Sequence, residues 1–449
     1  MMASNRKERY ILLVILAAIA IFAIVLNEGP RQVEEEIIIP DEILDCDYCT
    51  FDYGTPYTLA YTYLQPDGNR VIDGKLDILN AERLEVNLEG IPEWVLAAPS
   101  DNGSIWAVVM DNGAVQAFEL SDGTVEEVDI DPSNIHPDTP PILMVKDDEA
   151  FLLAPGSWNE SLYTHPIVLA SSGRNVFIDT EGDLVFRVNE KESARLDVNA
   201  LPDARLIQDE NERILLLTGP TEEYRHGVLG DSIEASSITI VETAGVPGIS
   251  KVIDLPEGDV VEGIAPIWSD LNDDGKREII VTLSNAEEGA RVVVLDEDGS
   301  ILAEGPDAGT GYRWRHQIAV AAFGPDGETE LVDVLTPHIG GIVEFYQWED
   351  DELKVVSGLS GYSSHLAGSR DLDMAIAGNF DEDEEIELLV PLQSYRELAV
   401  LEHTDDGVTV VTNIELTDSL STNIAAVNNG YGMTAIGVGT NDGMLSIWF

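Results

Sequence analysis

The chain has 449 residues, enough for one large domain or about two to three average ones. Its 84 Asp and Glu residues, against 24 Lys and Arg residues, give a formal net charge of -60. Such a surface repels duplex DNA, so nucleic acid is not an expected partner. Val, Ile and Leu occur throughout, which excludes an extended disordered acidic chain. The charge therefore coats a folded body, either as an adaptation to high salt or as a surface that collects cations.

The chain opens with a candidate membrane anchor. Residues 10–26 are an apolar run, at the short end of what spans a bilayer. Basic residues precede this run and acidic residues follow it, so we expect residues 1–9 in the cytoplasm and the rest of the chain outside the cell. A cleaved signal peptide is the alternative, although no small-x-small cleavage site follows. The sequence therefore predicts a single-pass cell-membrane protein with a transmembrane signal anchor.

Residues 27–50 predict an acidic linker that holds the body away from the membrane, because two prolines and many carboxylates favour an extended chain. The linker contains Cys46 and Cys49, the two cysteines of the chain. A zinc site needs further ligands that are not nearby, and a redox pair would need a βαβ setting. We expect a small local disulfide, with two free thiols as the alternative.

The body, residues 51–449, predicts an all-β fold. Ile105–Met110 is a β-rich run, a tight turn ending in Gly113 follows, and Ala114–Phe118 is the next β-rich run. The same alternation of short strands and Gly-containing turns recurs to the end of the chain. No convincing amphipathic helix interrupts it.

Repeated units predict a β-propeller. The best-defined units begin near Gly263, Gln317, Leu372 and Asn423, at a spacing of roughly 50 to 55 residues. Dividing the body by this period gives about seven blades, with eight as the alternative. The chain ends in an apparent third strand, so we expect an N-terminal strand, from 57–64 or 76–88, to complete a blade. An array of β-sandwiches is the rival fold, but its repeats would be about 90 to 100 residues.

One loop has the spacing of a calcium site. Oxygen-bearing side chains occupy positions 1, 3, 5 and 9 of this loop: Asp270, Asn272, Asp274 and Glu278. Gly275 lies where the loop must turn sharply, and the backbone carbonyl of Lys276 is a further expected ligand. Calcium prefers six to eight hard oxygen ligands, which alternating residues of a tight loop can present to one centre. A strand follows the loop, so an EF-hand is excluded.

This loop resembles the FG-GAP or VCBS repeat of integrin-α-type propellers, where a calcium loop joins the first two strands of a blade. A second copy matches at Asn379, Asp381, Asp383, Glu385 and Glu387, although Glu384 replaces the glycine. A third, at 322–330, has lost the first two ligands and is expected to be a metal-free turn. The resemblance implies structural Ca²⁺. The alternative is that these loops are plain acidic hairpin turns.

The scarce cationic residues gather in a few segments. Our candidate ligand-binding residues are Arg225, His226, Arg313, Trp314, Arg315, His316, His338, His365, Arg370 and Arg396. In a propeller, the segments that carry these residues would join either successive blades or the second and third strands of one blade. Both kinds of loop emerge on the same face of a propeller, around the mouth of its central channel. The calcium loops emerge on the opposite face.

Three interpretations of this cluster remain open. It could bind an anionic or polyhydroxyl ligand, with Tyr312 and Trp314 stacking on a ring. It could hold a transition metal through His226, His316, His338 and His365. Alternatively, the arginines pair with local carboxylates and the histidines with loop carbonyls.

No catalytic motif is recognisable in the sequence. We therefore expect a cell-surface, calcium-stabilised β-propeller binding module for a glycan, an anionic ligand or a protein. The alternative is an extracellular propeller enzyme of the polysaccharide lyase or hydrolase type that uses the Arg/His cluster.

Overall fold

A computed structural model describes residues 57–449, except 147–148, 157–158, 189–190, 382, 384 and 430–431. The expected anchor, the linker and the Cys46/Cys49 pair lie outside the described residues. No helix in the described part of the chain is long and apolar enough to cross a membrane. The described residues belong to one compact unit.

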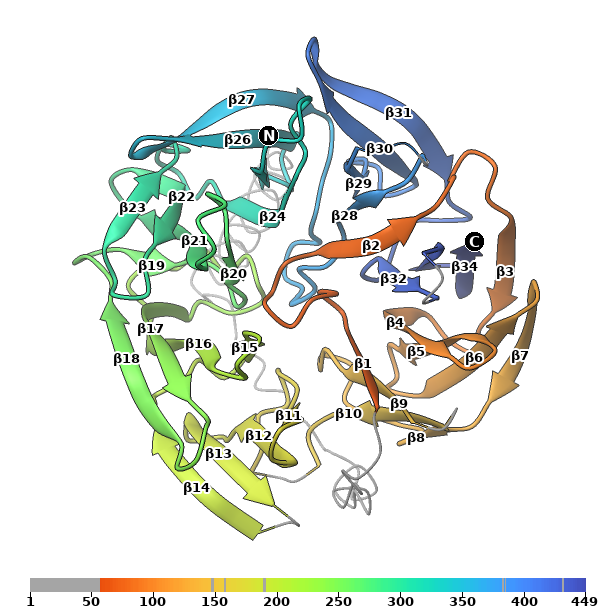
Figure 1. Cartoon of the computed structure of the whole chain (residues 1–449), viewed down its shortest axis with the longest axis horizontal. Coiled ribbons are helices and arrows are strands. Elements are labelled where there is room, and N and C mark those ends of the chain that lie inside the picture. The colour runs from red at the N-terminus through yellow and green to blue at the C-terminus, as the bar shows by residue number, and fades with distance from the viewer. Residues whose placement is uncertain are drawn as a thin grey trace, which may run out of the picture. The chain divides into compact units, whose positions relative to one another are not determined.

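The fold is an all-β propeller, as the sequence predicted. The described strands group into eight blades, which follow one another around a common axis (Figure 1). The 13-stranded sheet comprises three of these blades, linked by short pairings such as Ala235 with Val261 and Glu304 with Glu352. Eight blades therefore replace the estimate of about seven.

Blades 1 to 4 occupy the first half of the body. Blade 1 contains β4 (Pro92–Ser100), β5 (Gly103–Met110), β6 (Val115–Ser121) and β7 (Thr124–Val128). Blade 2 contains β1 (Thr58–Tyr61), β9 (Ile142–Lys146), β10 (Glu149–Leu153) and β8 (Ile130–Asp131). Blade 3 contains β11 (Ile167–Leu169), β12 (Arg174–Ile178), β13 (Asp183–Val188) and β14 (Lys191–Asp197). Blade 4 contains β15 (Ile207–Gln208), β16 (Ile214–Thr221), β17 (Glu234–Glu242) and β18 (Gly248–Asp254).

Blades 5 to 8 complete the ring. Blade 5 contains β20 (Ile267–Ser269), β21 (Glu278–Asn285), β22 (Gly289–Leu295) and β23 (Ile301–Glu304), and β19 (Val260–Val261) bridges it to blade 4. Blade 6 contains β24 (Arg315–Ala321), β25 (Glu330–Leu335), β26 (Ile342–Glu349) and β27 (Glu352–Ser360). Blade 7 contains β28 (Ile376–Asn379), β29 (Glu387–Pro391), β30 (Glu397–Thr404) and β31 (Gly407–Glu415), with β2 (Val71–Lys75) beside β28. Blade 8 contains β32 (Ala425–Asn428), β33 (Thr434–Thr440), β34 (Met444–Trp448) and β3 (Arg83–Asn87).

Burial explains why the middle strands are continuously apolar. Apolar side chains on both faces of a blade pack against the neighbouring blades, so β21 and β22 are buried along almost their whole length. The outer strands β18 and β27 instead have mostly exposed or half-buried positions, since they lie at the rim of their blades. Apolar clusters join consecutive blades, as where Ile318 and Phe345 of blade 6 pack with Leu388 of blade 7.

The N-terminal segment closes the ring. Strand β3 pairs with β34 and supplies the fourth strand of blade 8, which confirms the expectation for residues 76–88. Strand β1, from the other predicted range, pairs with β9 and completes blade 2. Because blade 2 takes β1 from elsewhere in the chain, its other three strands occupy a short stretch of sequence, and a uniform period undercounted the blades.

Between β1 and β3, residues 62–78 form an N-terminal strap along the inner strands. The strap makes hydrogen bonds to four successive blades: Gln208 N to Pro66 O (2.7 Å), Trp268 N to Asp67 O (2.9 Å), Asn69 Nδ2 to Val320 O (2.8 Å) and Ala377 N to Arg70 O (2.8 Å). The strap also buries Arg70 in the interior. There Arg70 and Arg205 both pair with Asp373, at 2.8 Å and 2.7 Å, and all three side chains are buried.

Candidate functional site

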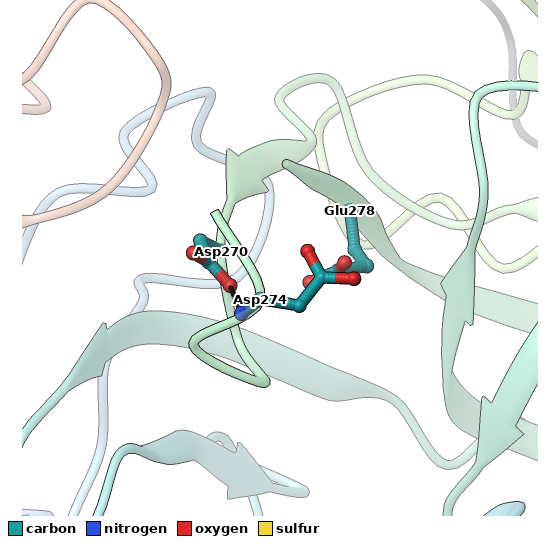
Figure 2. Close-up of side chains that lie close together, drawn as sticks. All are labelled: Asp270, Asp274 and Glu278. Atoms are coloured by element: carbon teal, nitrogen blue, oxygen red, sulfur yellow. Dashed lines mark hydrogen bonds between the residues drawn. The ribbon is translucent and has the colours of Figure 1, made fainter. Parts of the chain in front are cut away.

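The first acidic loop joins β20 to β21, the first two strands of blade 5. The structure brings carboxylate oxygens of Asp270, Asp274 and Glu278 within 4.8 Å of one another (Figure 2). The three side chains therefore form a set that could hold a metal ion.

Backbone amides fix the loop in this conformation. Gly275 has a φ of +84°, a left-handed conformation that favours glycine, and its N–H donates to Asp270 Oδ2 at 2.8 Å. The amides of Asp274 and Lys276 donate to Asn272 Oδ1 and Asp274 Oδ1, each at 2.9 Å. These bonds orient the side chains before any ion arrives.

Glu278 lies at the base of the loop and is 3 % exposed. Its Oε2 accepts a hydrogen bond from the backbone N–H of Leu271 at 2.9 Å. Burial raises the pKa of Glu278, and the nearby carboxylates of Asp270 and Asp274 act in the same direction. A cation in the loop would offset this repulsion.

The second acidic loop joins β28 to β29 of blade 7 and repeats this pattern. Asp381, Asp383 and Glu387 also bring carboxylate oxygens within 4.8 Å of one another. Phe380 N donates to Glu387 Oε2 at 2.5 Å, the counterpart of the Leu271 bond, and Glu385 N donates to Asp383 Oδ1 at 2.8 Å. The side-chain amide of Asn379 donates to the carbonyl of Asp383 at 2.5 Å.

Within the second loop, Glu387 lies in an electrostatically unfavourable environment. The side chain is 0 % exposed, and among the described residues its Oε1 has no hydrogen-bond partner. Burial, followed by repulsion from Asp381 and Asp383, raises its pKa to about 8. An unpartnered buried oxygen on a carboxylate that belongs to such a cluster is a position that a cation would satisfy.

The third loop, between β24 and β25 of blade 6, satisfies its glutamate differently. Glu330 is buried, and its Oε1 accepts a hydrogen bond from Gln347 Nε2 at 2.8 Å. His403 Nδ1 lies 2.8 Å from its Oε2. Side chains thus occupy both oxygens of Glu330.

The four candidate histidines do not form a metal centre. Within the described ranges, the two acidic loops are the sets in which three metal-binding groups converge. His338 Nε2 and His365 Nδ1 lie 2.8 Å apart, and His365 Nε2 lies 2.9 Å from the Ser369 carbonyl oxygen. Because a carbonyl only accepts, His365 carries its proton on Nε2 and accepts the bond from His338.

Burial keeps these histidines neutral. It lowers the pKa of His338 to about 4 and that of His365 to about 3. The pKa of His316 is also lowered by burial, and its Nδ1 lies 2.8 Å from Ser364 Oγ. Trp314 is 2 % exposed and stacks on His316 with 4.9 Å between ring centroids. Trp314 is therefore a packing residue, contrary to the expectation that it stacks on a ligand.

Most of the candidate arginines are bound to carboxylates. Arg315 lies within β24 and contacts Asp333 and Glu344, whereas the sequence placed it in a loop. Three further arginines also make ion pairs: Arg225 with Glu222, Arg370 with Asp203 and Asp231, and Arg396 with Asp418. Arg313 is different, since it donates to the carbonyl of Ala308 at 3.2 Å.

A pocket of about 470 Å³ gathers His226, Tyr312, Arg313, His338 and part of Trp314, and we call it the Tyr312 pocket. Tyr312 is 52 % exposed and has a φ of +55°, which is unusual for a bulky residue. Its ring stacks on His226 at 5.3 Å between centroids. His226 comes from the β16–β17 connection, not from a link between blades as the sequence indicated.

Sequence reasoning missed the residues behind this pocket. His226 Nδ1 hydrogen-bonds to Glu262 Oε1, and Ser284 Oγ donates to Glu262 Oε2. Glu262 is fully buried and lies 36 positions from His226. No local motif connects residues so far apart, so only the fold reveals this pair.

No protein-family model and no curated protein matches the chain. Solved structures of similar fold include BamB from Moraxella catarrhalis, with 10 % identity and a TM-score of 0.41 over 84 % of this chain and 96 % of that one. The C-terminal WD40 domain of Sif2 has 8 % identity and a TM-score of 0.44 over 81 % and 98 %. A chain in a structure of the mitotic checkpoint complex has 12 % identity and a TM-score of 0.43 over 84 % and 97 %. The arrangement of the sheets in this chain places it in the class of β-propellers.

Proposed function

We propose that this protein is a calcium-stabilised β-propeller binding module that recognises a glycan at the Tyr312 pocket. In this proposal the two acidic loops hold structural Ca²⁺, as in the FG-GAP or VCBS repeats that they resemble. Residues 10–26 anchor the chain in the cell membrane and display the propeller outside.

Calcium is supported by the chemistry of the loops. Hard carboxylate and amide oxygens in a tight loop are the ligands that Ca²⁺ prefers. The two loops share one hydrogen-bonding pattern, in which the backbone N–H of Leu271 or Phe380 binds the glutamate at position 9. The buried, unpartnered Oε1 of Glu387 is the observation that carries this part of the proposal.

A glycan is favoured over a strongly anionic ligand because most cluster arginines already bind carboxylates. The pocket retains features that suit a polyhydroxyl ligand. Tyr312 presents an exposed aromatic face, and its left-handed backbone, next to Gly311, keeps the ring at the rim. Arg313 and His226 provide hydrogen-bonding groups beside it.

Isothermal titration with a panel of neutral and uronic-acid-containing oligosaccharides tests the pocket. We expect one class to bind the wild type and Tyr312→Ala to weaken that binding at least tenfold, with an unchanged melting temperature. Val246→Ser, at an apolar position that is 90 % exposed and outside the pocket, is the control and should bind normally. Binding that survives Tyr312→Ala would contradict the proposed pocket.

An enzymatic function is the second candidate, favoured by the His226–Glu262 pair. A buried carboxylate that orients an imidazole is an arrangement used in general base catalysis. A lyase acting on a uronic-acid polysaccharide would release an unsaturated product that absorbs ultraviolet light. If no polysaccharide that binds yields this product, the enzymatic function is excluded and the binding function remains.

Display outside the membrane is tested by adding protease to intact cells. The proposal predicts removal of the propeller, from about residue 46 onward, while the N-terminus stays protected. Complete protection of the chain would contradict the predicted orientation.

A further inference from the structure

In three blades the second strand begins with a glutamate that directly follows the loop from the first strand. These residues are Glu278, Glu330 and Glu387. The second and third strands of these blades pair in antiparallel register, with Ile279 opposite Leu295, Leu331 opposite Tyr346 and Leu388 opposite Leu401. Extending each register by one residue places Asp296 opposite Glu278, Gln347 opposite Glu330 and Glu402 opposite Glu387. Cross-strand neighbours point to the same face of a sheet.

The third loop, in blade 6, shows how the residue opposite the glutamate can satisfy it without a cation. Gln347 is an amide, and its Nε2 donates to Glu330 Oε1 at 2.8 Å. His403 supplies the partner of the other oxygen. The buried carboxylate of Glu330 is therefore satisfied entirely by protein groups, and nothing further is required there.

In the two acidic loops the same position holds a second carboxylate, which cannot donate when ionised. Like charges directly opposite each other destabilise a sheet. Glu387 Oε1 is a buried oxygen that has no hydrogen-bond partner among the described residues. Lys75 of the strap donates through Nζ to the backbone carbonyl of Asp383 in this loop.

We propose that Glu402 and Asp296 complete the two calcium sites from the ends of the third strands, β30 and β22. Each ion then ties the first, second and third strands of its blade together. The inference rests on the proposed calcium binding and adds a carboxylate that the nine-residue loop pattern does not contain.

The test uses Asp274→Ala as background, so that only the second site binds. Isothermal titration with Ca²⁺ and melting in chelator are compared for Glu402→Gln and for Glu397→Gln, a control on the same strand. We expect Glu402→Gln to weaken calcium binding about tenfold or more and to raise the melting temperature in chelator, because repulsion with Glu387 is removed. The control should change neither quantity.

Unchanged affinity in Glu402→Gln, or a lower melting temperature in chelator, would overturn the inference while leaving calcium binding intact. Absence of calcium binding to the unsubstituted chain would overturn the proposed function as well. If Glu402→Gln fails to fold, Asp296→Asn in an Asp383→Ala background gives the equivalent comparison at the first site, with the same expected loss of affinity.

Discussion

Arg277 of the first acidic loop donates a hydrogen bond to Asp67 of the N-terminal strap, with 2.7 Å between Nη1 and Oδ2. The same guanidinium group binds the carbonyl of Trp268 at 2.6 Å, next to the amide that donates to Asp67 O. On the second loop, Lys75 of the strap donates to the carbonyl of Asp383. The strap that closes the ring is therefore fastened to both acidic loops.

Asp67→Ala should loosen this closure. We expect a loss of about 1 to 2 kcal/mol in the free energy of unfolding, because a charge-assisted hydrogen bond to a partly buried arginine is removed. Hydrogen exchange should also become faster in residues 62–78. Urea unfolding and exchange mass spectrometry measure the two effects, and Glu126→Gln, on an outer strand, is the control. Unchanged exchange in the strap would contradict its fastening through Asp67.

Asp373→Asn should destabilise the protein more strongly. Burial acts to raise the pKa of Asp373, but the guanidinium groups of Arg205 and Arg70 hold it at about 2. The substitution leaves two buried cations without their counter-ion, which costs about 3 to 5 kcal/mol. Urea unfolding should show this loss, whereas Asp73→Asn, at an exposed position, should stay near the wild type. A loss below about 1 kcal/mol would show that the network is not needed.

The buried histidines predict loss of stability in acid. The pKa of His365 is about 3 in the folded protein, against an ordinary value of 6.5. The unfolded chain therefore binds the proton more readily, so the contribution is fully present above pH 6.5 and is lost as pH falls toward 3. Each such histidine changes the free energy of unfolding by up to about 1.4 kcal/mol per pH unit within this range.

Unfolding free energies measured between pH 7 and pH 4 should fall for the wild type and fall less steeply for His365→Leu. Identical slopes in the two proteins would contradict the neutral state assigned to His365. His403, which hydrogen-bonds to Glu330, serves as the comparison position.

Local chemistry could be predicted from the sequence, and distant pairing could not. The side chains of the first loop lie within nine residues, so their spacing alone predicts that Asp270, Asp274 and Glu278 converge, as they do. The pairs formed by the arginines span long separations, such as 167 residues between Arg370 and Asp203. With so many carboxylates available, no sequence pattern selects the right one.

The blade count shows a related limit. The period was read from the C-terminal half, where blades 5, 6 and 7 each take their four strands from one continuous stretch of sequence. Blade 2 instead assembles β1, β8, β9 and β10, and β1 lies far from the others along the chain. A strand taken from a distant part of the chain does not appear in the sequence period. The proposed role of Glu402 could not be predicted for the same reason, because it follows only from the strand register, in which Leu388 lies opposite Leu401.

The most direct test of the account is the melting temperature in excess Ca²⁺ and in chelator, for the wild type and for an Asp274→Ala, Asp383→Ala double variant. Each occupied site adds about 2.7 kcal/mol of stability when free calcium is a hundredfold above its dissociation constant. Measurements at several salt concentrations are needed because sodium screens the loop carboxylates. We predict that calcium raises the wild-type melting temperature and that the double variant does not respond. Equal wild-type melting temperatures in calcium and in chelator at moderate salt would contradict the account.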